Sequence, residues 1–262
     1  MDWAETFDYY WYQKADPRAS QLPLLESPII IPVILCFYFY FVLKWGPKYM
    51  KDRTPYDLKI FRMCYNIFLI ISNAIIIQQF ISAGWFTEMT VFCEPADYSN
   101  NPKSMKVVHT LWLGLLTKIV DLLETGVYVL RKKDRQVSFL HLYHHVSTVL
   151  VCWIITRYTP VAEISFPMLV NCAEHVIMYT YYLFTSFGAK WQRILKPIKP
   201  LITILQMVQF IVMTVYLLQP FMPHCNGLKT PSAVLILNYV MNFVLFYSFF
   251  KNTYTKPAKK VE

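Results

Sequence analysis

Three histidines within five positions are the first residues of this chain that could perform chemistry. His144 and His145 follow His141 by three and four residues, which places all three imidazoles on one face of a helix. Ionisable side chains in an apolar helix are unfavourable and are functional candidates by default. A single histidine in such a segment is usually a packing residue, but three together indicate a site.

Two further apolar segments carry polar stripes. Lys118, Asp121 and Thr125 share one helical face, and Glu124 lies at its edge. The second stripe consists of Asn171, His175, Met178 and Tyr182, and Tyr179 lies on the same segment. An ion pair within the first helix would explain Lys118 and Asp121, but it would leave the neighbouring stripe unexplained. We therefore expect a polar cavity between these helices.

Amide side chains follow in the last two apolar segments. Gln206 and Gln209 lie in the first of them, and Asn238 and Asn242 lie in the second. Amides within a membrane also form interhelical hydrogen bonds, worth about 0.6 kcal/mol each. For Gln209 and Asn242, both interpretations, cavity lining and interhelical bonding, stay open.

Clustered histidines are compatible with three chemistries. Imidazole binds iron, zinc and copper, and the four clustered histidines suffice for one ion but are few for a two-iron oxygenase. A zinc protease is disfavoured because H-E-x-x-H is absent. Histidine is also a general acid or base near neutral pH, and as a nucleophile it can accept an acyl group and pass it on. A hydrophobic cavity beside basic loops favours acyl transfer from a phosphate-rich carrier.

Membrane helices must position these stripes, because the chain is 56% hydrophobic and only 16% charged. Crossing the hydrocarbon core takes about 20 apolar residues in a helix that pairs its own backbone groups. The segments that approach this length are 27–45, 63–83, 107–129, 139–158, 164–187, 201–219 and 232–250. We therefore predict an all-α polytopic protein, with an N-terminal tail (1–26), a seven-span membrane domain (27–250) and a C-terminal tail (251–262).

Positive charge orients the predicted spans. Counted with Lys44 at the end of the first span, the connections after the first, third, fifth and seventh spans hold six, four, four and four Lys or Arg residues. Counted with Arg157 at the end of the fourth span, the N-terminal tail and the other connections hold two, two, one and one. This asymmetry predicts a cytosolic C-terminus and an N-terminus on the opposite side. Most of the net charge of +9 is thus a topology signal, and nucleic acid is not an expected partner.

Two cysteines, Cys93 and Cys225, lie in the two longest non-cytosolic loops. In an oxidising compartment they could form a disulfide. They could also be two unrelated free thiols, and the residues alone leave both interpretations open.

Four motifs make the sequence similar to the very-long-chain fatty acid elongases, along all seven predicted spans. His141-Leu-Tyr-His144-His145 matches H-x-x-H-H, which alone is a weak signal because desaturases carry it too. NCAEHVIMYTYY at 171–182 matches N-x-x-x-H-x-x-M-Y-x-Y-Y, and residues 203–209 match T-x-x-Q-x-x-Q. Residues 118–125 match K-x-x-E-x-x-D-T, but Asp121 and Glu124 interchange the two acids. This departure puts the separate roles of the two acids in doubt.

The resemblance implies that the spans from the second to the seventh form a bundle around a substrate cavity. It also implies a reaction in which long-chain acyl-CoA and malonyl-CoA give 3-oxoacyl-CoA, CO2 and CoA, without a metal or other cofactor. His144 would be the acyl-accepting nucleophile beside His175, while His141 and His145 orient the site and handle protons. Asp121 and Glu124 would also be catalytic. The implied substrate-binding residues are Lys118, Asn171, Tyr179, Tyr182, Gln206 and Gln209.

The resemblance further implies a lumenal disulfide between Cys93 and Cys225. The ending Lys259-Lys260-Val261-Glu262 is similar to a di-lysine retrieval signal, which is an address read by receptors. We therefore expect a multi-pass protein of the endoplasmic reticulum membrane, with a lumenal N-terminus. The expected partners are the two CoA substrates, membrane lipid, a second copy of the chain and other enzymes of the elongation cycle.

Two other functions share parts of this pattern. A histidine-box desaturase or hydroxylase would contain iron and depend on dioxygen. A seven-span receptor or transporter shares the span count, but it has no need for three histidines and two acids at membrane depth. Activity of the purified protein on CoA substrates alone would separate these alternatives from an elongase.

Overall fold

The fold is helical throughout the part of the chain that the computed structural model describes, residues 2–255. The helices are α1 (Trp3–Asp8), α2 (Ile30–Tyr40), α3 (Gly46–Met50), α4 (Lys59–Ala83), α5 (Pro102–Leu130), α6 (Phe139–Tyr158), α7 (Ala162–Ser186), α8 (Ala189–Leu195), α9 (Ile198–Leu217) and α10 (Lys229–Phe250). Short π-helical and 3-10 turns extend some of them, and residues 2–255 contain no β-strand. The predicted all-α class is confirmed.

Within residues 2–255, five helical segments are long and apolar enough to cross a membrane. They are Ile30–Met50, Lys59–Ala83, Phe139–Tyr158, Ile198–Phe221 and Lys229–Thr255. The 29-residue α5 and the 25-residue α7 are of similar length, but they carry the polar stripes. The protein is thus a polytopic membrane protein, and the count of seven spans stays a prediction.

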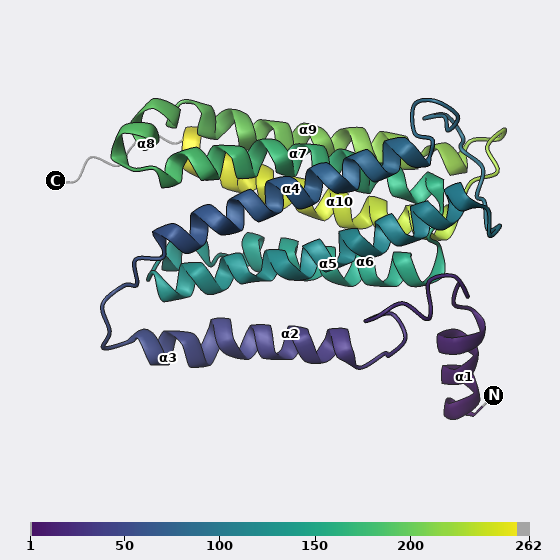
Figure 1. Ribbon diagram of the computed structural model, residues 1–262, viewed down its shortest axis with the longest axis horizontal. Coiled ribbons are helices and arrows are strands. Elements are labelled where there is room, and N and C mark those ends of the chain that lie inside the picture. Colours follow the sequence, from purple (N-terminus) through teal and green to yellow (C-terminus); the bar gives the residue numbers. More distant parts are fainter. Residues whose placement is uncertain (1, 256–262) are drawn as a thin grey trace.

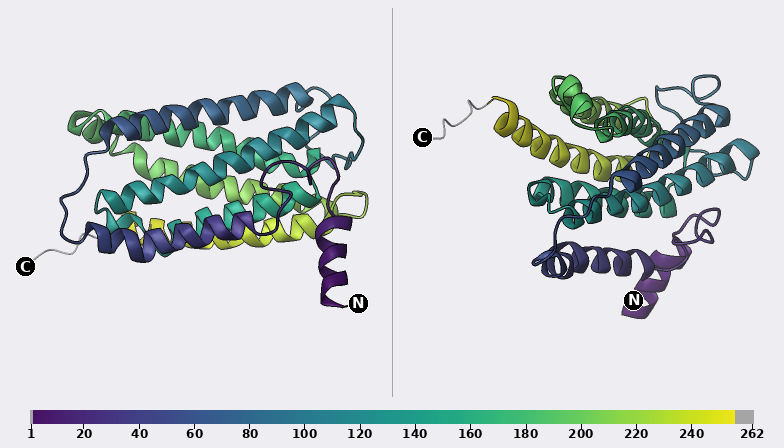
Figure 2. Two further views of the ribbon diagram at one scale, coloured as in Figure 1. Left: turned by 60° about the horizontal axis from the view of Figure 1, so that its bottom comes forward. Right: turned by 60° about the vertical axis from the view of Figure 1, so that its left-hand side comes forward.

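The long helices run side by side, and the chain reverses direction between successive ones (Figure 1). Helix α4 packs against α7 and α5, and α9 packs against α10. The segment from α2 to α3 lies along one side of this bundle, next to α5 and α6 (Figure 2). The bundle predicted for the second to seventh spans is therefore present.

The first predicted span has different bounds from the helix that forms. The prediction was 27–45, whereas the helical segment covers Ile30–Met50 and contains a π-helical turn at Phe41–Trp45. Proline is tolerated in the first turn of a helix, so Pro47 can begin the short α3 instead of ending the segment. The hydropathy pattern missed this extension because the added turn is polar.

The N-terminal segment, predicted as a tail, is held against one end of the bundle. The Arg157 guanidinium is buried, donates to the carbonyl oxygens of Trp11 and Leu25, and lies 3.9 Å from the Trp11 ring centroid. Indole nitrogens add two bonds, from Trp112 to Pro23 O (2.9 Å) and from Trp153 to Leu24 O (3.1 Å). A buried guanidinium must find acceptors, and here backbone carbonyls of the N-terminal segment supply them.

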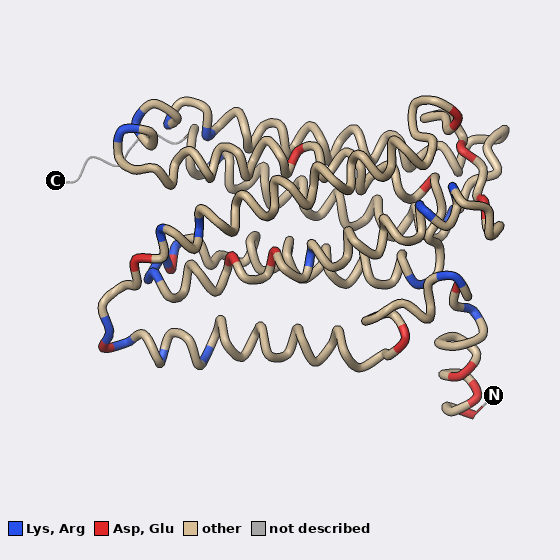
Figure 3. The backbone as a smooth tube through the Cα atoms, viewed as in Figure 1, with Lys and Arg blue, Asp and Glu red and all other residues tan. Residues whose placement is uncertain are grey.

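Lys and Arg gather at the opposite end, where α3 and α5 end and α8 lies (Figure 3). We call this the basic end, and the other the disulfide end, since it holds the Cys93–Cys225 disulfide with a Cα–Cα distance of 5.4 Å. The di-lysine ending at 259–262 lies outside the described residues. The side of the membrane that each end faces stays a prediction.

Loss of the disulfide should lower stability, because Cys93 and Cys225 join loops 132 residues apart. We expect a Cys93→Ser/Cys225→Ser variant to lose about 2 kcal/mol, the low end of the usual range, since the membrane already restricts the unfolded chain. Thermal unfolding in detergent measures the change, and Cys36→Ser, at an exposed free cysteine, is the control. Alkylation of both Cys93 and Cys225 in unreduced protein would contradict the disulfide.

Candidate active site

A polar cavity of about 610 Å³ lies among α5, α6, α7, α9 and α10. It is lined by ten of the predicted site residues: Lys118, Asp121, Glu124, His141, His144, His145, His175, Tyr179, Tyr182 and Gln206. Arg135 and Lys199 also line it and are exposed near the basic end. The cavity therefore combines exposed cations with buried histidines and acids.

The stripe on α5 forms a buried charge pair with partners on α7. Lys118 Nζ lies 3.5 Å from Asp121 Oδ2, and both residues are 3% exposed. The Tyr179 hydroxyl donates to Asp121 Oδ1 at 2.9 Å, and Lys118 Nζ lies 3.2 Å from His175 Nε2. A buried ion pair is tolerated when further hydrogen bonds satisfy its members. This network meets that condition and links α5 to α7.

The hydrogen bonds of His175 determine its tautomer. Its Nδ1 lies 2.8 Å from the carbonyl oxygen of Asn171, which can only accept. Nδ1 therefore carries the hydrogen, and Nε2 is left to accept from the Lys118 ammonium. Glu174 Oε2 lies 3.0 Å from Nδ1, but neither buried carboxylate oxygen has a hydrogen-bond partner among residues 2–255. The imidazole thus stands between the Lys118 side-chain nitrogen on one side and the Asn171 carbonyl and Glu174 carboxyl groups on the other.

The tautomer of His144 is set in the same way by α10. Asn242 Nδ2 donates to Asn238 O (2.8 Å) and approaches Asn238 Oδ1 (3.2 Å). Asn242 Oδ1 therefore faces His144 Nδ1, at 3.1 Å, and accepts its hydrogen. Nε2 keeps its lone pair, and the described chain provides it with no hydrogen-bond partner. This nitrogen is available as a nucleophile or a base.

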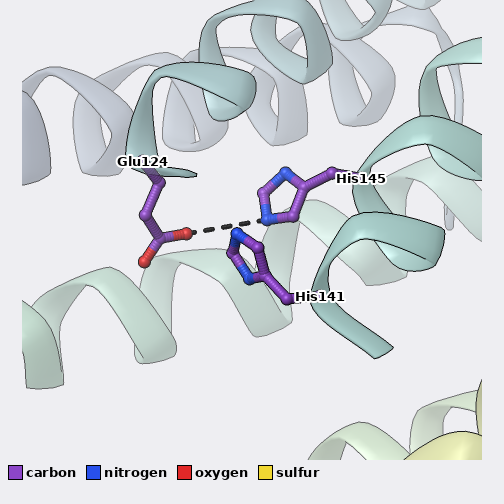
Figure 4. Close-up of side chains that lie close together, drawn as sticks. All are labelled: Glu124, His141 and His145. Atoms are coloured by element: carbon purple, nitrogen blue, oxygen red, sulfur yellow. Dashed lines mark ion pairs between the residues drawn. The ribbon is translucent and has the colours of Figure 1, made fainter. Parts of the chain in front are cut away.

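His141 and His145 lie together beside Glu124 (Figure 4). His145 Nε2 is 3.7 Å from Glu124 Oε2, and the Tyr128 hydroxyl donates to Glu124 Oε1. His141 Nε2 is 2.8 Å from the Thr125 hydroxyl. The ligand atoms of the three residues lie within 4.8 Å of one another. They could hold a metal ion after small side-chain movements, since zinc bonds to nitrogen and oxygen are about 2.0–2.2 Å long.

A smaller, mostly apolar pocket of about 70 Å³ adjoins the polar cavity, and both are lined by Lys118, His144 and Thr148. Its apolar lining includes Leu111, Val151, Ile155, Ile164, Phe210 and Leu235. From His144 it follows α6 toward Arg157, which contacts the N-terminal segment at the disulfide end. His144 therefore lies where a polar and an apolar compartment meet.

The family model described as ELO, the GNS1/SUR4 family, matches residues 23–262. The chain belongs to this family. It is 37% identical to mouse "Very long chain fatty acid elongase 1" over 94% of this chain and 88% of the mouse protein. It is 38% identical to rat "Very long chain fatty acid elongase 7" (95% and 89%) and 34% identical to human "Very long chain fatty acid elongase 4" (97% and 81%).

Two predicted site residues of this ELO family member lie outside the polar cavity. Asn171 lines the apolar pocket, and its side-chain oxygen has no partner within residues 2–255. Gln209 is 5% exposed and lines neither compartment. The Gln206 amide contacts Met178 Sδ at 3.4 Å. Substrate contacts by Gln209 thus stay a prediction that the cavity does not support.

Other site residues were not selected from the sequence. In the sequence, Asn242 is only an amide in an apolar segment, and this does not show which side chain it bonds. The Tyr38 hydroxyl lies 2.8 Å from the Thr125 hydroxyl, and Tyr65 donates to the backbone of α5. Tyrosine is common in membrane helices, so nothing in their spacing distinguished these hydroxyls from interface aromatics.

Proposed function

We propose that this protein is the condensing enzyme of fatty acid elongation, a 3-oxoacyl-CoA synthase. It would extend a long-chain acyl-CoA by two carbons from malonyl-CoA. Membership of a family with members named as very long chain fatty acid elongases supports the substrate class. The observation that carries the chemistry is His144 Nε2, a lone-pair nitrogen at the junction of a polar cavity and an apolar pocket.

In the first half-reaction, His144 Nε2 attacks the thioester carbonyl of acyl-CoA. A C–N bond forms, the C–S bond breaks, and the acyl group stays on a cationic imidazole that retains its Nδ1 hydrogen. Asn242 Oδ1 accepts that hydrogen bond and so stabilises the cation. CoA leaves as a thiolate and takes a proton from water. The apolar pocket suits the part of the acyl chain next to the thioester, and Arg135 and Lys199 suit the phosphates of the carrier.

In the second half-reaction, malonyl-CoA loses CO2 and the resulting enolate attacks the acyl carbonyl. A C–C bond forms and the C–N bond breaks, which returns a neutral His144 and releases 3-oxoacyl-CoA. The charges balance, because the acyl-imidazolium cation and the malonyl carboxylate cancel. The Lys118 ammonium, held by Asp121, is the group best suited to stabilise the enolate oxygen.

The same proposal includes an endoplasmic reticulum location with the basic end in the cytosol. Malonyl-CoA and acyl-CoA are charged, so they must reach the polar cavity from water. The cations Arg135 and Lys199 line this cavity near the basic end, which supports entry from that side. Protease accessibility of tags at the two termini in sealed microsomes tests the orientation, and both tags on one side would contradict it.

The proposed reaction is tested with purified protein, acyl-CoAs of graded length and malonyl-CoA labelled in the free carboxyl group. We expect 3-oxoacyl-CoA, free CoA and labelled CO2 in equal amounts, without dioxygen or added metal. A product with a new double bond or hydroxyl, formed only with iron and dioxygen, would instead indicate a histidine-box oxygenase.

Removing the Asn242 side-chain oxygen should slow the first half-reaction. In Asn242→Leu the His144 Nδ1 hydrogen loses its acceptor, a loss of about 1–3 kcal/mol for a buried group. We expect a rate roughly 10- to 100-fold lower, measured as CoA released from acyl-CoA alone. Asn242→Asp keeps an acceptor and should lose less.

The matched control is Asn73→Leu, which removes another buried amide whose nitrogen bonds only to its own helix. This variant should affect stability but not the rate of CoA release. Equal losses of rate in Asn242→Leu and Asn73→Leu would contradict the role of Asn242 in setting the tautomer.

A further inference from the structure

A groove of about 430 Å³ lies at the basic end, between the α2–α3 segment and the end of α5. It shares no lining residue with the polar cavity. Its floor consists of the buried apolar side chains of Val42, Met50 and Val129, and Leu43 and Pro47 form an exposed wall. The groove is therefore a separate feature, apolar at its base and open at one side.

A close approach between the two helices creates this groove. A side chain at Gly46 would meet Val129 Cγ1 and the carbonyl oxygen of Phe41, each at 2.7 Å. Glycine therefore allows the α2–α3 segment to touch α5 at this position. Next to this contact, residues of both segments line the groove.

Two lysines border the groove, one on each side. Lys132 Nζ donates to the backbone carbonyl of Lys51 at 3.1 Å, so its ammonium is held across the groove. Asp134 is the one carboxylate in the lining. The lining thus carries one net positive charge, and Arg131 and Lys133 are the sequence neighbours of Lys132.

Aromatic residues place this groove at the membrane interface. Trp45 is 45% exposed and stacks on Tyr49, with ring centroids 4.9 Å apart, and the Arg53 guanidinium lies 4.0 Å from the Tyr49 ring centroid. Tryptophan and tyrosine concentrate at the headgroup level of membranes. By this rule we expect Lys51 at the headgroup level, and Leu43, two turns earlier in the same segment, on the hydrocarbon side.

We propose that this groove binds one anionic glycerophospholipid. The phosphate lies between the ammonium groups of Lys51 and Lys132, and one acyl chain follows the apolar wall past Pro47 and Leu43. Basic pockets between membrane helices are suited to anionic lipid headgroups. The apolar floor distinguishes this ligand from a soluble phosphate, and the separation from the polar cavity distinguishes it from the CoA carrier.

The test measures binding of dioleoyl phosphatidic acid to the delipidated full chain in neutral detergent, by native mass spectrometry. We expect one phosphatidic acid per chain, at least tenfold weaker binding of phosphatidylcholine, and no displacement by millimolar inorganic phosphate. Lys51→Gln/Lys132→Gln should weaken phosphatidic acid binding at least tenfold. Leu43→Trp, which keeps the charges and fills the apolar wall, should weaken it as well.

The control variant is Lys190→Gln/Arg193→Gln, which removes the same charge from α8 at the same end of the bundle. It should bind phosphatidic acid as the wild type does. Equal weakening by both double variants would show general attraction to the basic end and overturn the proposal. Full displacement by phosphate, or binding that neither Lys51→Gln/Lys132→Gln nor Leu43→Trp changes, would also overturn it.

Discussion

His144→Ala is expected to lower the release of CoA from acyl-CoA by at least about 10³-fold, because it removes the only nucleophile proposed for the first half-reaction. Wild-type enzyme mixed with acyl-CoA alone should release about one equivalent of CoA and gain the mass of the acyl group. The alanine variant should show neither signal. Quenched-flow measurement of CoA, together with intact mass, reports both quantities on one sample.

The buried thiols are the rival nucleophiles. Cys172 is 1% exposed and lines neither compartment, whereas Cys152 lines the apolar pocket and lies 3.9 Å from the Thr156 hydroxyl. Cys172→Ala and Cys152→Ala should therefore leave the CoA release and the acyl mass unchanged. If Cys152→Ala lost the acyl mass while His144→Ala retained it, the acyl group would be carried by the Cys152 sulfur and not by His144.

Steady-state kinetics distinguish the two-step reaction from a direct one. An acyl-enzyme requires ping-pong behaviour, because the first CoA leaves before malonyl-CoA reacts. A strict need for malonyl-CoA before any CoA appears would instead indicate condensation in a ternary complex. The histidines would then act only as acids and bases.

Asp121→Asn is expected to have the second-largest effect, and on two quantities. The change leaves the Lys118 ammonium buried without its carboxylate, which breaks a buried pair and should destabilise the protein by about 3–5 kcal/mol. It should also lower kcat by roughly 10²-fold or more, because the Lys118 ammonium, which faces His175, is then no longer held in place by a carboxylate. Thermal unfolding in detergent and condensation kinetics measure the two effects separately.

A double variant separates catalysis from folding. Lys118→Met/Asp121→Asn removes both charges, so no unpaired ion stays buried and most of the lost stability should return. Activity should stay low, because no ammonium is left to stabilise the enolate oxygen. Recovery of activity together with stability would make the pair a purely structural feature of α5.

Glu124→Gln provides a matched comparison on the same helix. Its side chain is 13% exposed, and a glutamine can still accept from the Tyr128 hydroxyl. We expect a smaller loss of stability than in Asp121→Asn. We also expect a smaller loss of activity, caused only by the loss of the charged contact with His145 at 3.7 Å. A larger loss of stability in Glu124→Gln would show that our ranking of the two acids is wrong.

The amino-acid sequence alone determined which segments form helices and which faces are polar. Both follow from local rules: about 20 apolar residues are needed to span the hydrocarbon, and 3.6 residues per turn bring positions three and four apart together. These rules were sufficient for the stripe on α5, the three histidines on α6 and the stripe on α7. They also explain why the helix ends were less accurate, since polar turns extend α4 and α5 beyond their apolar cores.

Only the tertiary structure decided which polar groups meet. Asn242 and His144 are 98 residues apart, and Lys118 and His175 are 57 apart, so no local period relates them. The free Nε2 of His144 depends on its contact with Asn242. The packing of the N-terminal segment likewise depends on a distant partner, Arg157. The groove beside Gly46 also needs residues of the α2–α3 segment and of α5, which are far apart in the sequence. Helix formation satisfies the backbone along the chain, whereas partners between helices depend on packing that the local sequence does not encode.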